Sequence, residues 1–267
     1  MAANTSTTSG VYSRIIERIF LDRWTVGATE IPFERSDIVS VTKKLRVKLP
    51  KNLGDVIYSI RYRTPMPASV IECAPQGKSW VIEGVGRAKY CFKLARLARV
   101  VPNTALLSVK IPDATPQLVS RYAQGDEQAL LAKLRYNRLV DIFLGVAAYS
   151  LQNHLRSTVL GVGQIEIDEL YVGVDKGGRQ FAIPVQAKSG TDELSSVQMR
   201  QDMEYCRERF SNLICRPIAA QFAGDDLIAL FELALDDGEM RIVEEKHYRL
   251  VQACEISSAE LRAYSER

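Results

Sequence analysis

Four polar residues in the middle of the chain have the types and the spacing for chemistry on phosphate. Glu166 and Asp168 lie two residues apart, and Gln186 and Lys188 repeat this spacing further along the chain. Side chains two residues apart on a strand share a face, so each pair points one way if its segment is extended. A divalent cation that activates water for attack on phosphate needs one or two carboxylates, an amide and an ammonium grouped in this way.

A β-hairpin would position these side chains. Two stretches of alternating apolar and polar residues, Ile165–Val174 and Phe181–Lys188, flank the run Asp175–Arg179, whose two glycines suit a tight reversal. This pattern predicts two antiparallel strands with a Gly-containing turn. If the faces of the two strands match, the four polar side chains gather on one side of the hairpin.

These residues resemble the motif of the PD-(D/E)xK nuclease superfamily, which includes many restriction enzymes, Holliday-junction resolvases and repair nucleases. The family motif is an acid on one strand followed by an acid-x-Lys on the next, and the match here is Asp168 with Gln186-Ala187-Lys188. Gln replaces the second acid, as in Mrr-like restriction nucleases. The run Arg135–Asp202 is similar to restriction-endonuclease-like proteins of bacteria and archaea. The resemblance implies Mg²⁺-dependent cleavage of duplex DNA to 5′-phosphate and 3′-hydroxyl ends.

The resemblance gives each residue a role. Asp168 would be the main Mg²⁺ ligand, and Gln186 a neutral ligand whose missing charge Glu166 would supply. Lys188 would stabilise the transition state or hold the attacking water, or act as a base if burial depresses its pKa. The structural alternatives are a surface ion pair for Asp168 and an exposed strand end for Lys188. Asp141, a charge within an apolar segment, is a second candidate for the missing acid, or else a helix cap or ion-pair partner.

A helix predicted from about Asp192 to Phe210 follows the hairpin. Residues at intervals of three and four along this helix form the side that faces inward, and Gln198 and Gln201 are among them. Buried amides need hydrogen-bond partners, so we expect Gln201 to contribute to the catalytic site, with ordinary helix packing as the alternative. Gln201 and Tyr205 also match the QxxxY element of RecB-like members of the superfamily.

The fold class expected is α/β (α+β), with residues 118–267 forming a PD-(D/E)xK core of order αβββαβ: a mixed sheet flanked by helices. A long helical stretch, Gly125–Arg156, precedes the hairpin, and its part Leu139–Leu151 is apolar almost all round, as in a helix buried against a sheet. After the helix that ends near Phe210, strands are expected at Ile214–Phe222, Leu227–Leu235 and Met240–Tyr248.

The sequence predicts a winged-helix-like DNA-binding domain over residues 1–100. Residues 101–117 contain three prolines and are expected to form a linker. Helices are expected at Val11–Trp24, Arg35–Arg46 and Leu53–Arg63, followed by a hairpin whose wing lies near Gly84–Gly86. The third helix would be the recognition helix. The candidate DNA-binding residues are Tyr58, Arg61, Tyr62, Arg63, Arg87 and Lys89.

The charge distribution agrees with a DNA contact confined to one module. The net charge is only +3, but residues 35–63 hold eight Lys or Arg against two Asp. A solvated face and core tyrosines are the alternative explanations for the same residues. The five cysteines form no CxxC pair, which favours reduced thiols in a cytosolic protein. The resemblance to prokaryotic DNA nucleases implies association with the nucleoid. The sequence has no P-loop, no GxSxG motif, no signal peptide and no apolar run of transmembrane length.

The sequence therefore predicts a restriction-type DNA endonuclease whose cofactor is Mg²⁺ and whose partner is double-stranded DNA. Cutting both strands would need a homodimer or two successive nicks. Two alternatives remain. One is a structure-specific repair nuclease or resolvase, and the other is a non-catalytic DNA-binding regulator in which Gln186 marks a degenerate nuclease site.

Overall fold

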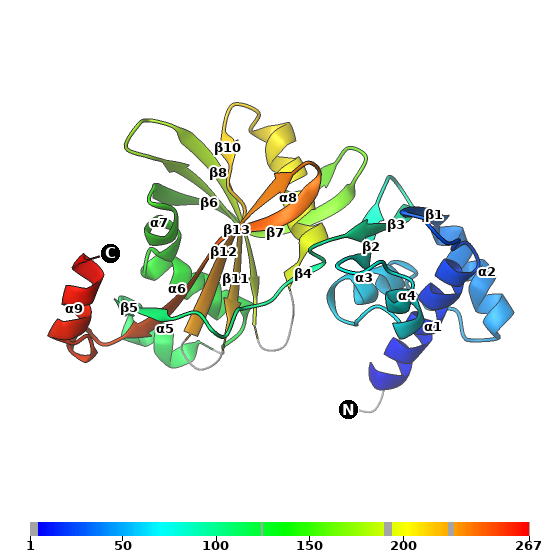
Figure 1. The fold of residues 1–267 in the computed structure, drawn as a ribbon, viewed down its shortest axis with the longest axis horizontal. Helices are drawn as coiled ribbons and strands as arrows, with labels where there is room; N and C mark the ends of the chain where they lie inside the picture. Colours follow the sequence, from blue (N-terminus) through cyan, green and yellow to red (C-terminus); the bar gives the residue numbers. More distant parts are fainter. Residues whose placement is uncertain (1–4, 124, 190–193, 224–226, 267) are drawn as a thin grey trace.

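The computed structural model describes residues 5–123, 125–189, 194–223 and 227–266. Figure 1 shows two lobes side by side, an N-terminal lobe from α1 to β3 and a C-terminal lobe from β4 to α9. Their apolar cores are separate. One cluster of buried apolar residues lies wholly in the N-terminal lobe. The buried residues of the other three clusters all come from Val100 or later in the sequence.

The N-terminal lobe packs helices against a small antiparallel sheet of order β1-β3-β2. The three predicted helices and the predicted hairpin are present, and the strand Glu30–Glu34 adds to them. Helix α2 starts with a capping box formed by Glu34 and Asp37. The elements are α1 Thr5–Leu21, β1 Glu30–Glu34, α2 Arg35–Leu45, α3 Gly54–Tyr62, α4 Ala68–Glu72, β2 Ser79–Gly84 and β3 Lys89–Ala95.

The C-terminal lobe is built on a mixed sheet of order β5-β13-β12-β11-β8-β7-β6, with β10 paired to β8 beside this path. Strands β6, β7 and β8 are antiparallel neighbours, and β11 runs parallel to β8. The strands are β4 Arg99–Val100, β5 Ser108–Pro112, β6 Ala147–Val159, β7 Gly163–Val174, β8 Gln180–Lys188, β9 Leu194–Ser195, β10 Ile214–Cys215, β11 Ile218–Phe222, β12 Leu227–Asp236 and β13 Glu239–Val251.

Helices cover both faces of this sheet. On one face, α6 and α7 pack their leucines against Ile183, Val185 and Ala187 of β8. On the other face, α8 packs Tyr205 and Cys206 against β7 and β8. The mixed sheet flanked by helices is therefore confirmed. The helices are α5 Gln117–Tyr122, α6 Glu127–Tyr136, α7 Leu139–Leu144, α8 Ser196–Arg209, the 3₁₀ turn Ala253–Glu255 and α9 Ser258–Ser265.

Strand β8, the second strand of the predicted hairpin, lies in the centre of the sheet. It is buried along nearly its whole length, between β7 on one side and β10 and β11 on the other. Pro184 cannot donate a ladder hydrogen bond, and it lies where pairing passes from β10 at Ala182 to β11 at Val185. The predicted hairpin is confirmed, with the pairs running from Val174↔Gln180 to Glu169↔Val185.

The prediction of one long helix over residues 125–156 is wrong. The helical part ends at Leu144, Gly145 adopts a left-handed conformation, and the chain continues as strand β6. The apolar run that suggested a buried helix belongs partly to the edge strand, whose outer side is exposed. Asp141 accepts a hydrogen bond from the Ala148 amide at 2.9 Å and pairs with Arg138, so the ion-pair explanation of this residue is confirmed.

The segment predicted as a linker contributes a strand. Residues 108–112 form β5, which runs parallel to β13 at the edge of the sheet. The predicted strand over 214–222 is interrupted at Arg216 and Pro217, which separate β10 from β11. Within the described ranges, no helix combines the length and the apolar character needed to cross a bilayer.

Polar contacts and one close backbone approach join the two lobes. Arg200 of α8 pairs with Glu83 of β2 at 3.3 Å, and β4 pairs antiparallel with β9 just before α8. Gly84 faces the carbonyl oxygen of Val162, and a Cβ at position 84 would lie only 2.6 Å from that oxygen. The absence of a side chain at Gly84 therefore permits the contact between β2 and the β6–β7 turn.

Candidate functional site

The candidate site lies where β7 and β8 separate. The backbone ladder between these strands ends at Glu169↔Val185, and beyond this pair β8 continues with β11 alone. Side chains replace the missing ladder bonds. The Ala187 amide donates to Oδ2 of Asp168 at 2.8 Å, and the Gln186 amide group donates to the carbonyl oxygen of Glu166 at 2.8 Å. Separation of the strands thus holds Asp168 and the Gln-x-Lys segment against each other.

Lys188 ends β8 as a largely buried ammonium. Its side chain is 13% exposed, and Nζ donates to Oε1 of Glu127 at 2.7 Å. Burial acts to lower the pKa of Lys188, but the negative charges of Asp168 and Glu127 outweigh burial and raise this pKa above its usual value. Lys188 is therefore a cation at neutral pH. This state suits the stabilisation of phosphate charge, and it does not suit the role of a base with a depressed pKa.

Asp168 is 8% exposed and has an unusual acidity. Burial raises its pKa to about 6, and the charges of Glu127 and Glu166 act in the same direction. The Lys188 ammonium and the Ala187 amide act against them. A carboxyl group that titrates near neutrality beside a buried lysine marks a candidate functional site, because ordinary structural carboxylates are kept ionised by their partners.

Helix α8 holds the Gln186 side chain from the opposite side. Gln186 is completely buried, its Nε2 donates to Oδ2 of Asp202 at 2.9 Å, and its Oε1 accepts from Gln198 at 2.6 Å. Asp202 is also completely buried, and its Oδ1 has no hydrogen-bond partner in the described part of the chain. Burial raises the pKa of Asp202 well above its usual value, and the Asp168 charge contributes to this rise.

Glu166 and Gln201 lie at the edges of this group. The Glu166 carboxylate is 43% exposed and pairs with Arg156 at 3.1 Å, although its charge still reaches Asp168. Gln201 is buried, and its Oε1 accepts a 3.4 Å hydrogen bond from the Tyr62 hydroxyl. The structure thus brings Asp168, Gln186 and Lys188 together, whereas Glu166 has a partner on β6 and Gln201 has one in the N-terminal lobe.

The oxygen atoms at this site determine whether it could hold a divalent cation. Among the described residues, no three His, Cys, Asp or Glu side chains are already grouped as metal ligands. The chemistry of the donors nevertheless fits Mg²⁺, which takes few carboxylates and keeps several waters. Asp168 has a second oxygen besides the one that Ala187 uses, and Oδ1 of Asp202 is an unpartnered buried acceptor. A cation would also favour the ionised form of both carboxyl groups.

Two residues of this site were missed by the sequence analysis. Glu127 follows the helix cap Asp126, so it reads as an ordinary acid of a first helical turn. Asp202 lies four residues after Gln198, which places both on the same side of α8. This spacing was the available signal for Asp202. For Glu127 the sequence has no such signal, because its distance from Lys188 depends on how α6 packs against β8.

The residues predicted to bind DNA have different surroundings. Arg87 and Lys89 are exposed beside the predicted wing. Tyr58, on α3, is 48% exposed, and the guanidinium of Arg63, just after this helix, lies 4.9 Å from the centre of the Tyr58 ring. Tyr58 also contributes to the raised pKa of Lys188. Helix α3 therefore faces the C-terminal lobe near the candidate site. Arg61 and Tyr62 are half-buried, and Tyr62 contacts Gln201 as described above.

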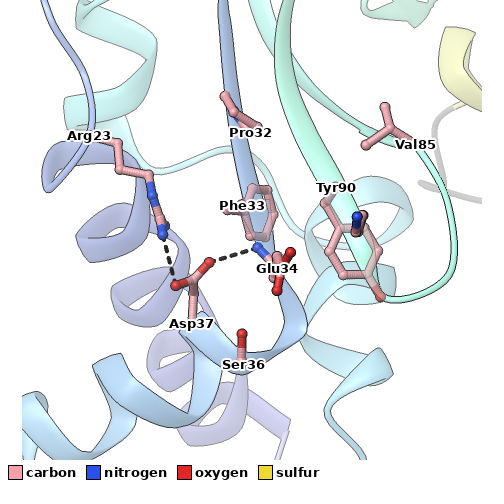
Figure 2. A pocket seen from close by; sticks show the side chains of 9 residues that line it. Arg23, Pro32, Phe33, Glu34, Ser36, Asp37, Val85 and Tyr90 are labelled. Carbon is pink, nitrogen blue, oxygen red and sulfur yellow. Dashed lines mark hydrogen bonds and ion pairs between the residues drawn. The ribbon is translucent and has the colours of Figure 1, made fainter.

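A cavity of about 470 Å³ lies beside the predicted wing. Figure 2 shows that Asp37 is held in it by two bonds, from the Arg23 guanidinium at 2.8 Å and from the Glu34 amide at 2.6 Å. Arg35 donates to the Tyr90 hydroxyl at 3.1 Å nearby. The charges of Arg23 and Asp37 in this cavity are therefore paired with each other.

Comparison with known proteins identifies no relative. No protein-family model matches the chain. No curated protein matches it, and no solved structure does.

Proposed function

We propose that this protein is a Mg²⁺-dependent DNA endonuclease of the PD-(D/E)xK type, acting on duplex DNA in a restriction-type role. The observation that carries the proposal is the group formed where β7 and β8 separate. There the Asp168 carboxylate, with its raised pKa, lies against the Gln-x-Lys segment, and Lys188 is a buried cation. Hydrolysis of a phosphodiester needs both an anionic ligand and a cation of this kind.

Different residues of the site would bind the metal ion, bind the phosphate and position the Gln-x-Lys segment. Asp168, with the unpartnered Oδ1 of Asp202 as a further acceptor, would hold Mg²⁺, while the Glu127 carboxylate stays paired with Lys188. When bound, the ion would neutralise phosphate charge and lower the pKa of water. The Lys188 ammonium would donate to the scissile phosphate. Gln198 and Asp202 hold the Gln186 amide from both ends, which fixes the segment that carries Lys188.

The order of the elements supports this proposal. Helices α6 and α7, strands β6 to β8, helix α8 and strand β11 follow each other as the αβββαβ order of the proposed nuclease core requires. In the N-terminal lobe, helices α1 to α3 and a small antiparallel sheet ending in a hairpin support a winged-helix-like DNA-binding module. Tyr58 on α3 and Arg63 just after it, with Arg87 and Lys89 near the hairpin, would contact DNA.

A nicking assay on supercoiled plasmid tests this proposal. With Mg²⁺, Asp168→Ala and Lys188→Ala should each lower the cleavage rate at least about 100-fold, because each removes a group that stabilises the charged transition state. Matched controls are Asp236→Ala and Lys176→Ala, an exposed acid and an exposed lysine outside the site, which should cleave normally. Near-normal cleavage by Asp168→Ala would overturn the assignment of the site.

A second candidate function is a non-catalytic DNA-binding regulator. The specific observation in its favour is the Gln186 side chain, whose oxygen accepts from Gln198 and whose nitrogen donates to Asp202 and to the Glu166 backbone. Both polar atoms of this amide are thus already bonded to protein groups, and an amide brings no charge to attract a metal ion. In this alternative the polar group is a structural remnant of a nuclease site.

The two candidates differ in one combined measurement. DNA binding by gel shift and nicking with Mg²⁺ or Mn²⁺ should be followed on the same methylated and unmethylated plasmids. Binding together with metal-dependent nicking supports the endonuclease. Binding without nicking under either metal and on either plasmid supports the regulator and rejects the endonuclease.

A further inference from the structure

Two cysteine thiols contact each other at the C-terminal end of α8. Cys206 lies near the end of this helix, and Cys215 lies in the short strand β10. Both belong to one apolar cluster, and both are free thiols. A hydrogen bond between the two thiols is the main reason why the pKa of Cys206 is raised. Two reduced sulfurs held in contact are the arrangement from which a disulfide forms.

The turn after α8 brings the two thiols together. The Phe210 amide donates to the Cys206 carbonyl oxygen at 2.8 Å, and the Leu213 amide donates to the Phe210 carbonyl oxygen at 2.9 Å. The chain therefore reverses directly after the helix and joins the sheet as β10, beside β8. Ser211 and Asn212 of this turn are exposed, so the turn can adjust when a covalent bond replaces the hydrogen bond.

The two sulfurs differ in how a small molecule can reach them. Cys206 is only 1% exposed, whereas Cys215 is half-buried. Cys215 lines a cavity of about 260 Å³, together with Met203, Phe210 and Leu213. Cys206 is not among the residues that line this cavity. A small oxidant that enters the cavity therefore meets Cys215 first.

The protons of the pair favour the same order. The hydrogen bond to Cys215, and then burial, raise the pKa of Cys206, so Cys206 keeps its proton at neutral pH and donates it to the Cys215 sulfur. The thiolate is the reactive form of cysteine, so Cys206 is the poorer nucleophile for a first attack. We propose that Cys206 and Cys215 form a reversible disulfide, with a hydroperoxide as the oxidant and Cys215 as the thiol that reacts first.

The reaction has two balanced steps. The Cys215 sulfur attacks one oxygen of hydrogen peroxide, the O–O bond breaks, and a sulfenic acid and one water form. The Cys206 sulfur then attacks the sulfenic sulfur, the S–O bond breaks, and the disulfide and a second water form. The two thiols lose two electrons, the peroxide gains them, and the two thiol protons leave in the waters. An external thiol reverses the bond by exchange.

Other cysteines of the chain have different surroundings. Cys91 is buried and its thiol donates to the Phe92 carbonyl oxygen at 3.3 Å. Cys254 is exposed, and its sulfur lies 3.8 Å from the Gln252 side-chain oxygen. Neither of these contacts is with a thiol. Cys254 therefore provides an internal control, because peroxide can reach it but these contacts give it no sulfur to bond with.

Peptide mapping of the peroxide-treated protein tests the proposal. The reduced wild type is treated with hydrogen peroxide, alkylated in denaturant and digested with trypsin. Cleavage after Arg207 and Arg209 places the two cysteines on separate peptides, so the disulfide appears as a linked pair that dithiothreitol separates. The linked pair should form at lower peroxide than oxidation of Cys254 requires. Its absence when Cys254 is already oxidised would overturn the proposal.

Single substitutions test which sulfur reacts first. In Cys206→Ala, the sulfenic-acid reagent dimedone should label Cys215, because no thiol is left to form the bridge. In Cys215→Ala, Cys206 should stay unlabelled. Cys91→Ala, which removes a buried thiol elsewhere, should form the bridge as the wild type does. Labelling of Cys206 in Cys215→Ala as strong as that of Cys215 in Cys206→Ala would contradict the assigned order.

Thermal unfolding gives a second readout, on the wild type itself. A bridge restricts the unfolded chain, so peroxide should raise the melting temperature by several degrees, and dithiothreitol should reverse the rise. Cys206→Ala, or Cys206→Ser if the alanine variant does not fold by circular dichroism, should show no such rise. An equal rise in the variant would reject the bridge as its cause. These measurements need neither DNA nor metal, so their outcome is independent of the nuclease proposal.

Discussion

Two buried polar groups in the same sheet differ in how completely their hydrogen bonds are made. The Arg216 guanidinium contacts both oxygens of Glu232, at 2.6 and 2.7 Å, and donates its third nitrogen to the Leu144 carbonyl oxygen. Around Asp168, by contrast, carboxyl groups lie close to each other, the pKa values of Asp168 and Asp202 are raised, and Oδ1 of Asp202 has no partner in the described chain.

The difference separates a structural ion pair from a candidate functional site. A bidentate arginine with all its nitrogens bonded stabilises one arrangement of β11 and β12. Carboxyl groups whose charges oppose each other destabilise the fold at neutral pH, and such a cost is common where a ligand or cation completes the site. The comparison yields three predictions, for a satisfied buried pair, an unsatisfied group and a satisfied surface pair.

The largest effect is expected from opening the satisfied pair. Glu232→Ala leaves Arg216 partly buried and unpaired, so the free energy of unfolding should fall by about 3 kcal/mol. Urea denaturation at pH 7 measures this loss. Arg156→Ala, which removes the exposed partner of Glu166, is the matched control and should cost less than about 1 kcal/mol. Equal losses in both variants would contradict the distinction drawn here.

A smaller effect of opposite sign is expected at Asp168. Its pKa is about 6 in the folded protein and 3.8 in the unfolded chain, so the folded state binds more protons between these values. Stability should therefore fall as pH rises from about 4 to above 6, by about 2 kcal/mol. Asp168→Asn keeps an acceptor for the Ala187 amide and removes the titration, so this variant should be the more stable protein at pH 7.

The measurement is urea denaturation of both proteins in EDTA from pH 4 to pH 7. The two curves should converge near pH 4, where Asp168 is largely protonated in the wild type. With Mg²⁺ present, the wild type should recover part of the lost stability and Asp168→Asn should not. A stability difference that stays constant over this pH range would show that burial does not raise the pKa of Asp168.

The smallest effect is expected at a satisfied group on the surface. The Lys110 ammonium and the Ser257 backbone and hydroxyl lower the pKa of Glu260 to about 2. A lowered pKa stabilises the fold above the usual value of 4.5, and this contribution disappears as pH falls towards 2. Glu260→Gln should thus lose stability at pH 7 and match the wild type at the acid end. Thermal unfolding from pH 2 to pH 7 tests this order.

Much of the fold was predictable because single segments carry their own periodicity. The alternation of Ile165–Val174 and Phe181–Lys188 predicted the hairpin, and the predicted helices that correspond to α2, α3 and α8 agree with the structure within a few residues. Strand β6 was not predictable in the same way. Its apolar run is compatible with a helix or a strand, and only pairing with β7 decides between them. Strand β5 was missed because its partner, β13, lies far away in sequence.

The candidate site shows the same limit. Asp168, Gln186 and Lys188 come from one hairpin, so local sequence could bring them together. Glu127 and Asp202 reach the site from helices on opposite faces of the sheet, and their contributions depend on tertiary packing. Sequence spacing also could not show that Glu166 pairs with Arg156 on the neighbouring strand, which moves its carboxylate away from the centre of the site.

The short pairing of β4 with β9 has a mechanical consequence. Residues 99–100 connect the lobes, and they are also hydrogen-bonded to Leu194 and Ser195, immediately before α8. The covalent connection is thus anchored to the helix whose Gln198 and Asp202 grip the Gln186 amide. A displacement of the N-terminal lobe would therefore be passed directly to the start of α8 through this pairing.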